Sequence, residues 1–248
     1  MGREQAHLPC EFERGVSSSV VVVERVFRDH GEVPPLCAKN QLAMQKTAYI
    51  AALLFASIVY AEAEDGFTPI FDGKTFDGWE GSMTMFYIED GAVVAGTLEA
   101  AIPHNYFLCT KKVYGDFELR LKFKLLGKGA NAGIQIRSKR IPNHHEVSGY
   151  QADLGDGWWG SLYDESRRNQ VLAKADEARL GEVLHRDDWN DYTIRCQGKR
   201  IQLWINGQQT VDYTEPDDKI EQRGVIGLQI HGGGPGQAWY KDVRIKEL

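Results

Sequence analysis

The chain has 248 residues, with 29 Lys and Arg against 35 Asp and Glu, which gives a formal net charge of -6. Apolar residues make up 42% and charged residues 26%, a globular composition rather than a disordered or fibrous one. The acidic balance argues against a general nucleic-acid binder. Four cysteines in so long a chain exclude a small scaffold held together by disulfides.

The composition changes near residue 64. All six tryptophans lie beyond residue 78, and the uncharged run 48–61 follows Lys46. A lysine, a short apolar run and a small-residue end predict a secretory signal peptide over 44–63, so we expect a secreted or periplasmic protein. The run is shorter than the roughly 20 residues of a spanning helix, and we expect no stable membrane span in the mature protein. A buried core helix is the alternative.

This interpretation divides the chain into three parts. Residues 1–43 show no sustained hydrophobic period, and we expect a mis-assigned or disordered N-terminal extension. Residues 44–63 are the predicted signal peptide, and 64–248 the functional domain. Only that last part enters the prediction of the fold.

The domain is predicted to be built of short strands. Residues 117–125 alternate apolar and charged side chains without a break, which is typical of a half-buried antiparallel strand. The same alternation marks 192–196 and 201–205, followed by the turn pair Asn206-Gly207. Further strands are expected at 86–88, 92–95, 225–231 and 238–245, and a short helix only within 168–179. The pattern predicts an all-β sandwich.

Three predicted strands each carry two polar side chains opposite their apolar face. The pairs are Gln135 with Arg137, Gln151 with Asp153, and Gln229 with His231. If these strands are neighbours in one sheet, the pairs form a convergent patch that suits the hydroxyl groups of a sugar. The alternative is a solvated sheet face with unrelated polar residues.

The segment 155–169 adds aromatic and charged candidates. Trp158, Trp159 and Tyr163 lie in a glycine-rich connection and could stack on sugar rings, or instead cap the core. Asp164, Glu165 and Arg167 follow and could supply an acid, a base and a clamp for hydroxyl groups. A surface ion-pair cluster is the alternative for these three.

Other chemistries have weak support. The sequence contains no phosphate-binding glycine loop, no dinucleotide fingerprint and no zinc-type cysteine cluster. The run His144-His145-Glu146 could ligate a metal, but adjacent side chains diverge in an extended segment, which favours an ordinary loop. Cys109 and Cys196 could form a disulfide or remain two buried thiols.

Six ordered motifs resemble one family. They are Phe71-Asp-Gly-Lys-Thr-Phe-Asp-Gly-Trp79, Tyr114-Gly-Asp-Phe-Glu-Leu-Arg120, Ala132-Gly-Ile-Gln-Ile-Arg-Ser138, Gly149-Tyr-Gln-Ala-Asp153, Gly227-Leu-Gln-Ile-His-Gly232 and Val243-Arg-Ile-Lys-Glu-Leu248. Over residues 66–248 the chain resembles the 3-keto-disaccharide hydrolase domains, also called 3-keto-glucoside lyase/hydratase domains. The resemblance implies a concanavalin A-like jelly-roll sandwich of two antiparallel sheets. Many members carry Gly-Tyr-Glu-x-Gln where this chain has Gln151 and Asp153, so the carboxylate and the amide are exchanged.

The resemblance implies cleavage of 3-keto-disaccharides or 3-keto-glycosides by C2 deprotonation, elimination and hydration. Such a site needs a base, a donor to the enolate oxygen and an acid for the leaving group. Asp153 or His231 is our expected base, and Arg137 with Gln135 the expected enolate stabiliser. The other member of the Asp153/His231 pair, or Glu165, would be the acid.

The remaining candidates are expected to bind the substrate. They are Gln151, Gln229, Trp158, Trp159, Tyr163, Asp164 and Arg167. No cofactor is required by the sequence, and a divalent metal could replace the cation. A non-catalytic, lectin-like module is the main alternative. A glycosidase with two carboxylates is the third, and it is disfavoured because the sequence shows no second strand-borne carboxylate on the face of Asp153.

Overall fold

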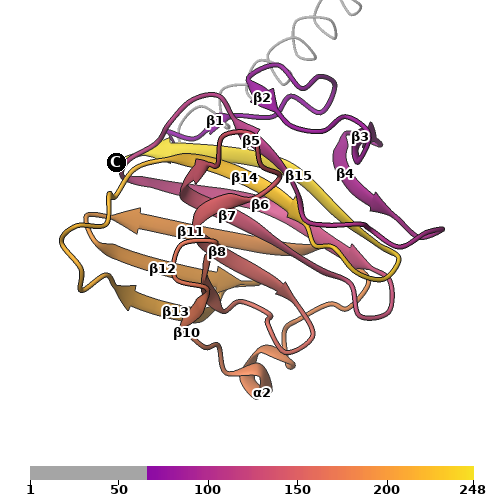
Figure 1. Cartoon of the computed structure of the whole chain (residues 1–248). Coiled ribbons are helices and arrows are strands. Elements are labelled where there is room, and N and C mark those ends of the chain that lie inside the picture. Colours follow the sequence, from indigo (N-terminus) through magenta and orange to yellow (C-terminus); the bar gives the residue numbers. More distant parts are fainter. Residues whose placement is uncertain (1–65) are drawn as a thin grey trace, which may run out of the picture. The chain divides into compact units, whose positions relative to one another are not determined.

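The computed structural model describes residues 66–248, which form two antiparallel β-sheets packed face to face (Figure 1). The predicted all-β jelly-roll sandwich is therefore confirmed. The expectations for residues 1–43 and 44–63 lie outside the described residues and stay predictions. Within the described part, no helix is both long and apolar enough to cross a membrane.

One layer, which we call the back sheet, has eight strands. They are β1 (Thr68–Pro69), β3 (Phe86–Glu89), β4 (Ala92–Thr97), β6 (Phe117–Leu126), β11 (Asn190–Gln197), β12 (Arg200–Ile205), β13 (Gln208–Thr214) and β15 (Gly236–Glu247). Their order across the sheet is β13-β12-β11-β6-β15-β4-β3, and β1 pairs with β15. The long strands β6 and β15 therefore lie in the middle of this layer.

The other layer, the front sheet, has seven strands. They are β2 (Trp79–Glu80), β5 (Tyr106–Thr110), β7 (Asn131–Arg140), β8 (Val147–Gly155), β9 (Leu162–Glu165), β10 (Gln170–Ala173) and β14 (Val225–Ile230). The order is β10-β9-β8-β7-β14-β5-β2. The three strands with predicted polar pairs, β8, β7 and β14, are consecutive neighbours, which is the arrangement that the sugar-patch hypothesis required.

The predicted alternation is the strand signal that the structure reproduces best. On β6 every second side chain from Phe117 to Leu125 is buried, and the charged residues between them are partly exposed. The turn pair between β12 and β13 adopts positive φ angles, 48° at Asn206 and 80° at Gly207. That geometry suits asparagine and glycine and closes a two-residue hairpin.

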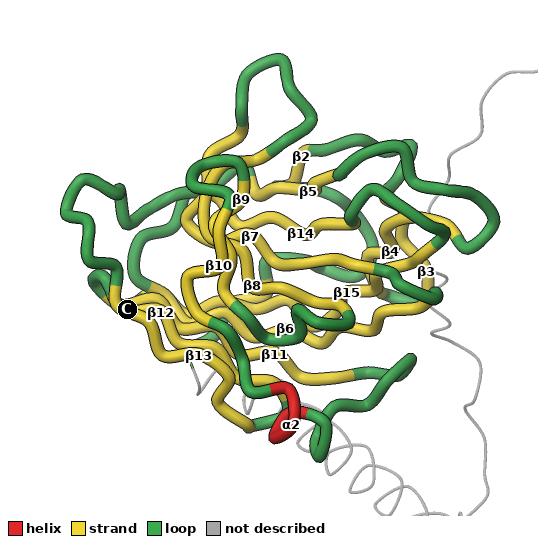
Figure 2. The backbone as a smooth tube through the Cα atoms, turned by 60° about the horizontal axis from the view of Figure 1, so that its bottom comes forward, coloured by secondary structure: helices red, strands yellow, loops and turns green. Residues whose placement is uncertain are grey.

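The prediction of a short helix within 168–179 is mostly wrong. Residues 170–173 form β10, paired with β9, and only Glu177–Leu180 are helical, as α2 at the edge of the sandwich (Figure 2). The side chain of Asp176 caps this turn by accepting from the backbone N–H of Ala178 and Arg179. Pairing with a strand edge outweighs weak helical propensity in so short a segment.

The apolar core lies between the inner faces of the two sheets. The front sheet contributes Ile134, Tyr150 and Leu228, which pack towards residues of the back sheet such as Phe123 and Ile194. Cys196 belongs to this core. Cys109 lies in a different apolar cluster with Phe107 and Val147. Both thiols are free and buried, so the disulfide alternative is wrong.

Candidate functional site

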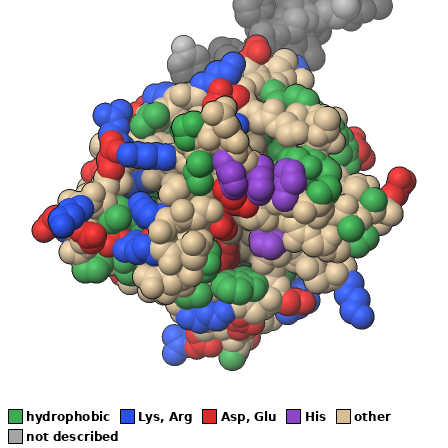
Figure 3. All heavy atoms as spheres, in the orientation of Figure 1, with side chains coloured by type: hydrophobic (Ala, Val, Ile, Leu, Met, Phe, Trp, Pro, Cys, Tyr) green, Lys and Arg blue, Asp and Glu red, His purple; other side chains and the backbone are tan. Residues whose placement is uncertain are grey.

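A cavity of about 420 Å³ opens on the outer face of the front sheet, and we call it the front cavity. Its lining combines acidic, amide and aromatic side chains with one histidine. The lining residues are Gly129, Ala130, Asn131, Gln151, Asp153, Asp156, Trp158, Tyr163, Glu165 and His231. In Figure 3 acidic side chains lie in a hollow beside histidine side chains on this face. The volume is within the usual range for small-ligand sites.

A line of hydrogen bonds leads to Asp153. Ser138 Oγ donates to Gln135 Oε1 (2.7 Å), Gln135 Nε2 donates to Gln151 Oε1 (2.5 Å), and Gln151 Nε2 donates to Asp153 Oδ1 (2.6 Å). The register places Gln135 directly opposite Gln151 on β7 and β8. Each amide therefore has its orientation set by the preceding partner, and the last amide holds the carboxyl group in place.

Gly133 makes this arrangement possible. It lies opposite Asp153 in the β7–β8 register, and a Cβ there would come within 2.7 Å of Gln151 Cδ. The missing side chain leaves the space across which Gln151 reaches Asp153. The glycine in the Ala132-Gly-Ile-Gln motif therefore has a steric role in the site.

Burial makes Asp153 a weak acid. The residue is 3% exposed, and desolvation raises the pKa of its carboxyl group to about 7, with a further rise from the charge of Glu165. The hydrogen bond from Gln151 and the charge of Lys174 oppose this rise. A carboxyl group with a pKa near 7 can both accept and donate a proton at neutral pH.

Glu165 is a second carboxyl group whose pKa is raised by burial. It ends β9 opposite Gly149, whereas Tyr163 lies opposite Gln151. Desolvation raises the pKa of Glu165 to about 7, the charge of Glu146 raises it further, and hydrogen bonds from Ser166 oppose the rise. The expectation that no other strand-borne carboxylate shares the face of Asp153 is therefore wrong. The sequence did not show that β9 pairs with β8.

The aromatic candidates divide between the cavity and the core. Trp158 and Tyr163 line the cavity with their rings edge to face, 5.9 Å between centroids, and Trp158 is 37% exposed. Trp159 is 7% exposed and stacks on Phe123 at 6.1 Å. Trp159 thus caps the core, which was the alternative for this segment, and two aromatic rings remain available for a sugar.

His231 lies at the cavity as an exposed residue directly after β14. Its Nδ1–H donates to the carbonyl oxygen of Gly232 at 2.6 Å. In the neutral ring this bond leaves Nε2 unprotonated and able to accept a hydrogen bond or a proton.

Gln229, an expected substrate-binding residue, is fully buried and does not line the front cavity, and its amide is unsatisfied. Within residues 66–248 neither Nε2 nor Oε1 has a hydrogen-bond partner. Gln229 lies opposite Gly133, the glycine whose missing Cβ leaves room for the side chain of Gln151. A buried amide without partners is costly, so this one is suited to bind a buried water molecule.

Arg137 does not line the cavity, which corrects its expected role as an enolate stabiliser. The residue has φ of 48° at a bulge in the β7–β8 pairing, and the bulge interrupts the alternation. Its guanidinium donates to Asp116 Oδ1, Gly115 O and Gly198 O at 2.7–2.8 Å. Arg137 therefore joins loops at one end of the sandwich. Gln135, its expected partner, acts on the site only through Gln151.

Asp164 and Arg167 also lie away from the cavity, which corrects their expected substrate contacts. Asp164 points to the inner side of β9, is fully buried, and pairs with Arg167 (2.8 Å) and Arg168. Arg168 also bridges to Glu215 at the end of β13 (2.7 Å). The group is a buried ion-pair network that ties the two sheets together under Glu165.

Metal ligation has no support from side-chain geometry in the described part. Among residues 66–248 no three His, Cys, Asp or Glu side chains come together in a way that could hold a metal ion. The rings of His144 and His145 stack with 4.4 Å between centroids, and the ring of His145 lies tilted against that of His104 at 4.1 Å. The divalent metal therefore stays a prediction from the sequence alone.

Two lining residues with polar side chains, Asn131 and Asp156, were not among the candidates from the sequence. Asn131 is the first residue of β7, and it shares a face with Gly133 and Gln135, so extending the alternation by two positions would have found it. Asp156 follows β8, pairs with Arg186 and accepts from Trp159 Nε1 at 3.1 Å. No local pattern marks that position.

The raised pKa of Asp153 has a consequence for stability. The pKa of this carboxyl group is near 4 in an unfolded chain and about 7 in the folded protein. The stabilisation of the fold that comes from this difference is therefore fully present below pH 4 and is lost as the pH rises through 7. Asparagine does not ionise, and Asp153→Asn is expected to raise the melting temperature at pH 8 by several degrees. A shift of one pKa unit corresponds to about 1.4 kcal/mol in the free energy of unfolding. In a domain of this size, 1 kcal/mol changes the melting temperature by about 2–4 °C.

Thermal unfolding at pH 5 and pH 8 measures the effect. Asp212→Asn is the matched control, because Arg200 lowers the pKa of that exposed carboxyl group and its loss brings no gain at pH 8. A melting temperature of Asp153→Asn that equals the wild-type value at both pH values contradicts the prediction.

Comparison with known proteins identifies a matching family and a relative. The 3-keto-alpha-glucoside-1,2-lyase-like domain family matches residues 66–246. A 3-keto-disaccharide hydrolase of Bacteroides thetaiotaomicron is 32% identical over 265 aligned positions, covering 84% of this chain and 88% of the relative.

Solved structures support the fold alone. A candidate glycosyl hydrolase from Parabacteroides distasonis has a TM-score of 0.60 at 19% identity, covering 76% of this chain and 96% of that one. The carbohydrate-binding module CBM66 of Bacillus subtilis has a TM-score of 0.54 at 12% identity, covering 68% and 96%. With motifs, fold and relative in agreement, the chain belongs to the 3-keto-alpha-glucoside-1,2-lyase-like domain family.

Proposed function

We propose that the front cavity cleaves the glycosidic bond of a 3-keto-disaccharide or 3-keto-glycoside by elimination and hydration. One observation carries the proposal: two carboxyl groups, Asp153 and Glu165, face the same cavity, and both have a pKa of about 7. At neutral pH such a pair supplies one ionised and one protonated member. Trp158 and Tyr163 beside them suit the flat faces of sugar rings.

The reaction balances without a redox partner. The base takes the proton from C2, and the electron pair moves into the C2–C3 bond as the C3 ketone becomes an enolate. The enolate then re-forms the ketone while C1=C2 forms and the C1–oxygen bond breaks, and the acid protonates the leaving oxygen. Water adds its oxygen to C1 and a proton returns to C2, so the sum is hydrolysis.

The positions of the two carboxyl groups suggest their roles. Asp153 is the base, because the amide of Gln151 both orients the carboxylate and favours its ionised form. Glu165 is the acid, because the neighbouring charge of Glu146 favours its protonated form. The cross-strand pair of Gln151 and Tyr163 lies between the positions of Asp153 and Glu165 along β8 and β9. We place C1 and C2 of the sugar over this pair.

Donors to the enolate oxygen come from the cavity wall. Asn131 and Tyr163 offer an amide and a hydroxyl group. Arg137 and Gln135 are not assigned this role, since neither lines the cavity. Gln229 does not line the cavity either, and its unsatisfied amide is suited to hold a buried water molecule.

A glycosidase that uses two carboxylates is the second candidate, because Asp153 and Glu165 also match the basic requirement of that mechanism. It differs in its substrate, since it needs no ketone to acidify the C2 proton. The lectin alternative needs no proton transfer at all, so raised carboxyl pKa values would have no use in it.

A pair of substrates separates the three functions. We expect the full chain to cleave a 3-keto-disaccharide and to leave the matching unoxidised disaccharide intact, as measured by release of reducing sugar. Cleavage of both sugars at similar rates would favour the two-carboxylate glycosidase. Binding of either sugar without cleavage would favour the lectin.

A further inference from the structure

A row of stacked rings lies beside the front cavity. The rings of His104 and Tyr106, at the start of β5, have centroids 4.2 Å apart. The ring of His145, in the loop between β7 and β8, lies 4.1 Å from that of His104 and 4.4 Å from that of His144. We call His104, His145 and His144 the histidine row. Figure 3 shows histidine side chains gathered next to the acidic hollow, yet the proposed reaction uses none of these three.

One end of the histidine row is fixed against the cavity wall. His104 packs against Gly232, where a Cβ would come within 2.7 Å of the His104 Cα. The backbone N–H of Gly232 also donates to Asn105 Oδ1 at 2.9 Å. Gly232 directly follows His231, which lines the front cavity, so His104 lies next to that wall.

The middle of the histidine row is linked to the proposed acid. His145 Nε2 lies 3.3 Å from Glu146 Oε1, and Ser166 Oγ donates to the other oxygen of Glu146 at 3.4 Å. Ser166 directly follows Glu165, which lines the front cavity. The row therefore borders the cavity at the end where Glu165 lies.

The backbone decides which nitrogen of each outer ring remains open. His144 Nδ1 accepts from the backbone N–H of Glu146 at 3.1 Å, so the neutral ring carries its proton on Nε2. His104 Nδ1–H donates to the carbonyl oxygen of Asn105 at 2.8 Å, so the neutral ring accepts through Nε2. Within residues 66–248 neither Nε2 atom has a hydrogen-bond partner. His144 is exposed and His104 is half-buried, so the row offers a donor and an acceptor that suit hydroxyl groups.

The proposed roles of the two carboxyl groups set the direction of the substrate. Asp153 takes the proton from C2 and Glu165 protonates the oxygen on C1, so the leaving group lies on the side of Glu165. Glu165 is opposite Gly149, which is nearer the start of β8 than Asp153 is. The loop that carries His144 and His145 leads directly into that start. A leaving group on C1 therefore extends towards the histidine row.

We propose that the histidine row is the leaving-group subsite of the front cavity, and that it selects a leaving group rich in hydroxyl groups, such as a second sugar ring. His144 Nε2–H donates to one hydroxyl oxygen, and His104 Nε2 accepts from another hydroxyl group. His145 lies between the two rings and keeps them in position. The subsite rests on the proposed reaction, and it decides which 3-keto-glycosides are cleaved fastest.

The test compares kcat/KM of the full chain on two substrates with the same 3-keto ring and anomer. One is a 3-keto-disaccharide, and the other is the methyl 3-keto-glycoside, whose leaving group is methanol. His104→Phe and His144→Phe each keep an aromatic ring in the row and remove the open Nε2. We expect each to lower kcat/KM on the disaccharide about threefold to tenfold, as for the loss of one hydrogen bond, and the double variant to lower it about tenfold or more. Turnover of the methyl glycoside should stay within about twofold of the wild type in all three variants.

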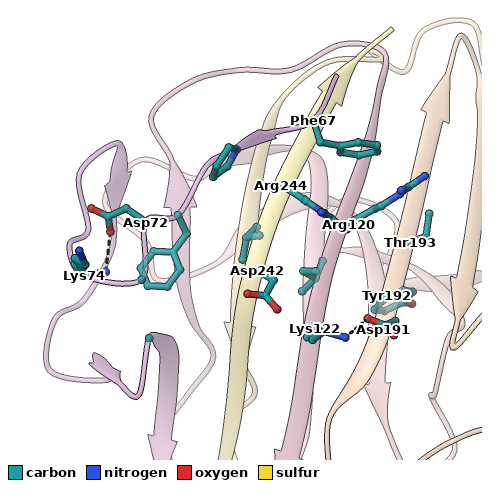
Figure 4. Close-up of a pocket in the computed structure, with 16 residues that line it drawn as sticks. Phe67, Asp72, Lys74, Arg120, Lys122, Asp191, Tyr192, Thr193, Asp242 and Arg244 are labelled. Carbon is teal, nitrogen blue, oxygen red and sulfur yellow. Dashed lines mark hydrogen bonds and ion pairs between the residues drawn. The ribbon is translucent and has the colours of Figure 1, made fainter. Parts of the chain in front are cut away.

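The back sheet provides a control far from the histidine row. A hollow of about 860 Å³ lies between the segment 67–74 and the strands β6, β11 and β15, and Asp242 lines it (Figure 4). Asp242 has φ of 54°, a conformation that asparagine tolerates. Asp242→Asn is therefore expected to leave kcat/KM on both substrates unchanged.

The outcomes separate the subsite from the reaction. Equal losses on both substrates in the histidine variants would show that the rings act on the chemistry or the fold, and would overturn the subsite. Unchanged disaccharide kinetics in the double variant would also overturn it, as would the same selective loss in Asp242→Asn. A wild-type chain that cleaves neither substrate would instead reject the proposed reaction, and the subsite with it.

Discussion

Asp153→Asn is expected to lower kcat on a 3-keto-disaccharide by about 10²- to 10⁴-fold, the usual contribution of a positioned general base. The substitution keeps the volume of the side chain and an oxygen that can accept from Gln151, so KM should change little. Steady-state kinetics at pH 7 measures both constants. Asp212→Asn, an exposed carboxyl group of the back sheet paired with Arg200, is the control and should retain full activity.

The pH profile gives an independent measurement of the same site. With both pKa values at about 7, kcat/KM of the wild type should pass through a narrow maximum near neutral pH. In Glu165→Gln the fall on the alkaline side should disappear, because that limb reports loss of the acid. If Asp153→Asn keeps its turnover within about threefold of the wild type, Asp153 is not the base and His231 becomes the remaining candidate.

Among the substitutions proposed for this protein, Glu215→Gln is expected to cause the largest loss of stability. The free energy of unfolding should fall by about 3–5 kcal/mol, because the substitution removes one partner of a buried ion pair. Glu215 is fully buried and accepts from Arg168 through both oxygens, at 3.0 and 2.7 Å, and from the Tyr150 hydroxyl at 2.7 Å. Glutamine keeps the shape but leaves Arg168 with one carboxylate partner, Asp164. Urea unfolding at pH 7 measures the loss.

The acid dependence of this effect has a definite sign. Burial opposes ionisation of Glu215, but the bonds from Arg168 and Tyr150 outweigh it and lower the pKa to about 2. A lowered carboxyl pKa stabilises the fold above the unfolded value near 4.3, and that contribution is lost as the pH falls towards 2. The stabilities of wild type and Glu215→Gln should therefore converge in acid.

Glu221→Gln is the matched control for the stability measurement, since this exposed side chain pairs with Lys139 on the surface. Exposed pairs contribute roughly 0–1 kcal/mol, so little change is expected. Equal losses in Glu215→Gln and Glu221→Gln would show that the buried network has no special role in stability.

Local periodicity was enough to predict the strands and part of the site. Alternation on β6, β7, β8 and β14 depends only on the two-residue period of an extended chain, and it assigned the faces of Gln151, Asp153 and Gln229 correctly. The same rule failed for Arg137, because a bulge reverses the face and no residue type in Ile136-Arg137-Ser138 marks a bulge. It also failed for the range 168–179, where pairing with β9 decides the structure.

The charged and aromatic residues of 158–168 could not be assigned from the sequence. Alternation along β9 sends Tyr163 and Glu165 to the outer face and Asp164 to the inner one, but the sequence did not show that this short segment is a strand. Trp158 and Trp159 are neighbours of the same type, and only the packing of Phe123 beneath one of them decides which ring lies in the core.

The sequence by itself determined an all-β domain over 66–248, its family, and a sheet face that bears Gln151, Asp153 and Gln229, because those features follow from short-range patterns and ordered motifs. Only the tertiary structure decided that Glu165 joins Asp153 at one cavity, and that Arg137, Asp164 and Arg167 serve the framework. Strand order, bulges and burial set those encounters, and burial sets the carboxyl pKa values. All three depend on contacts between residues far apart in the chain.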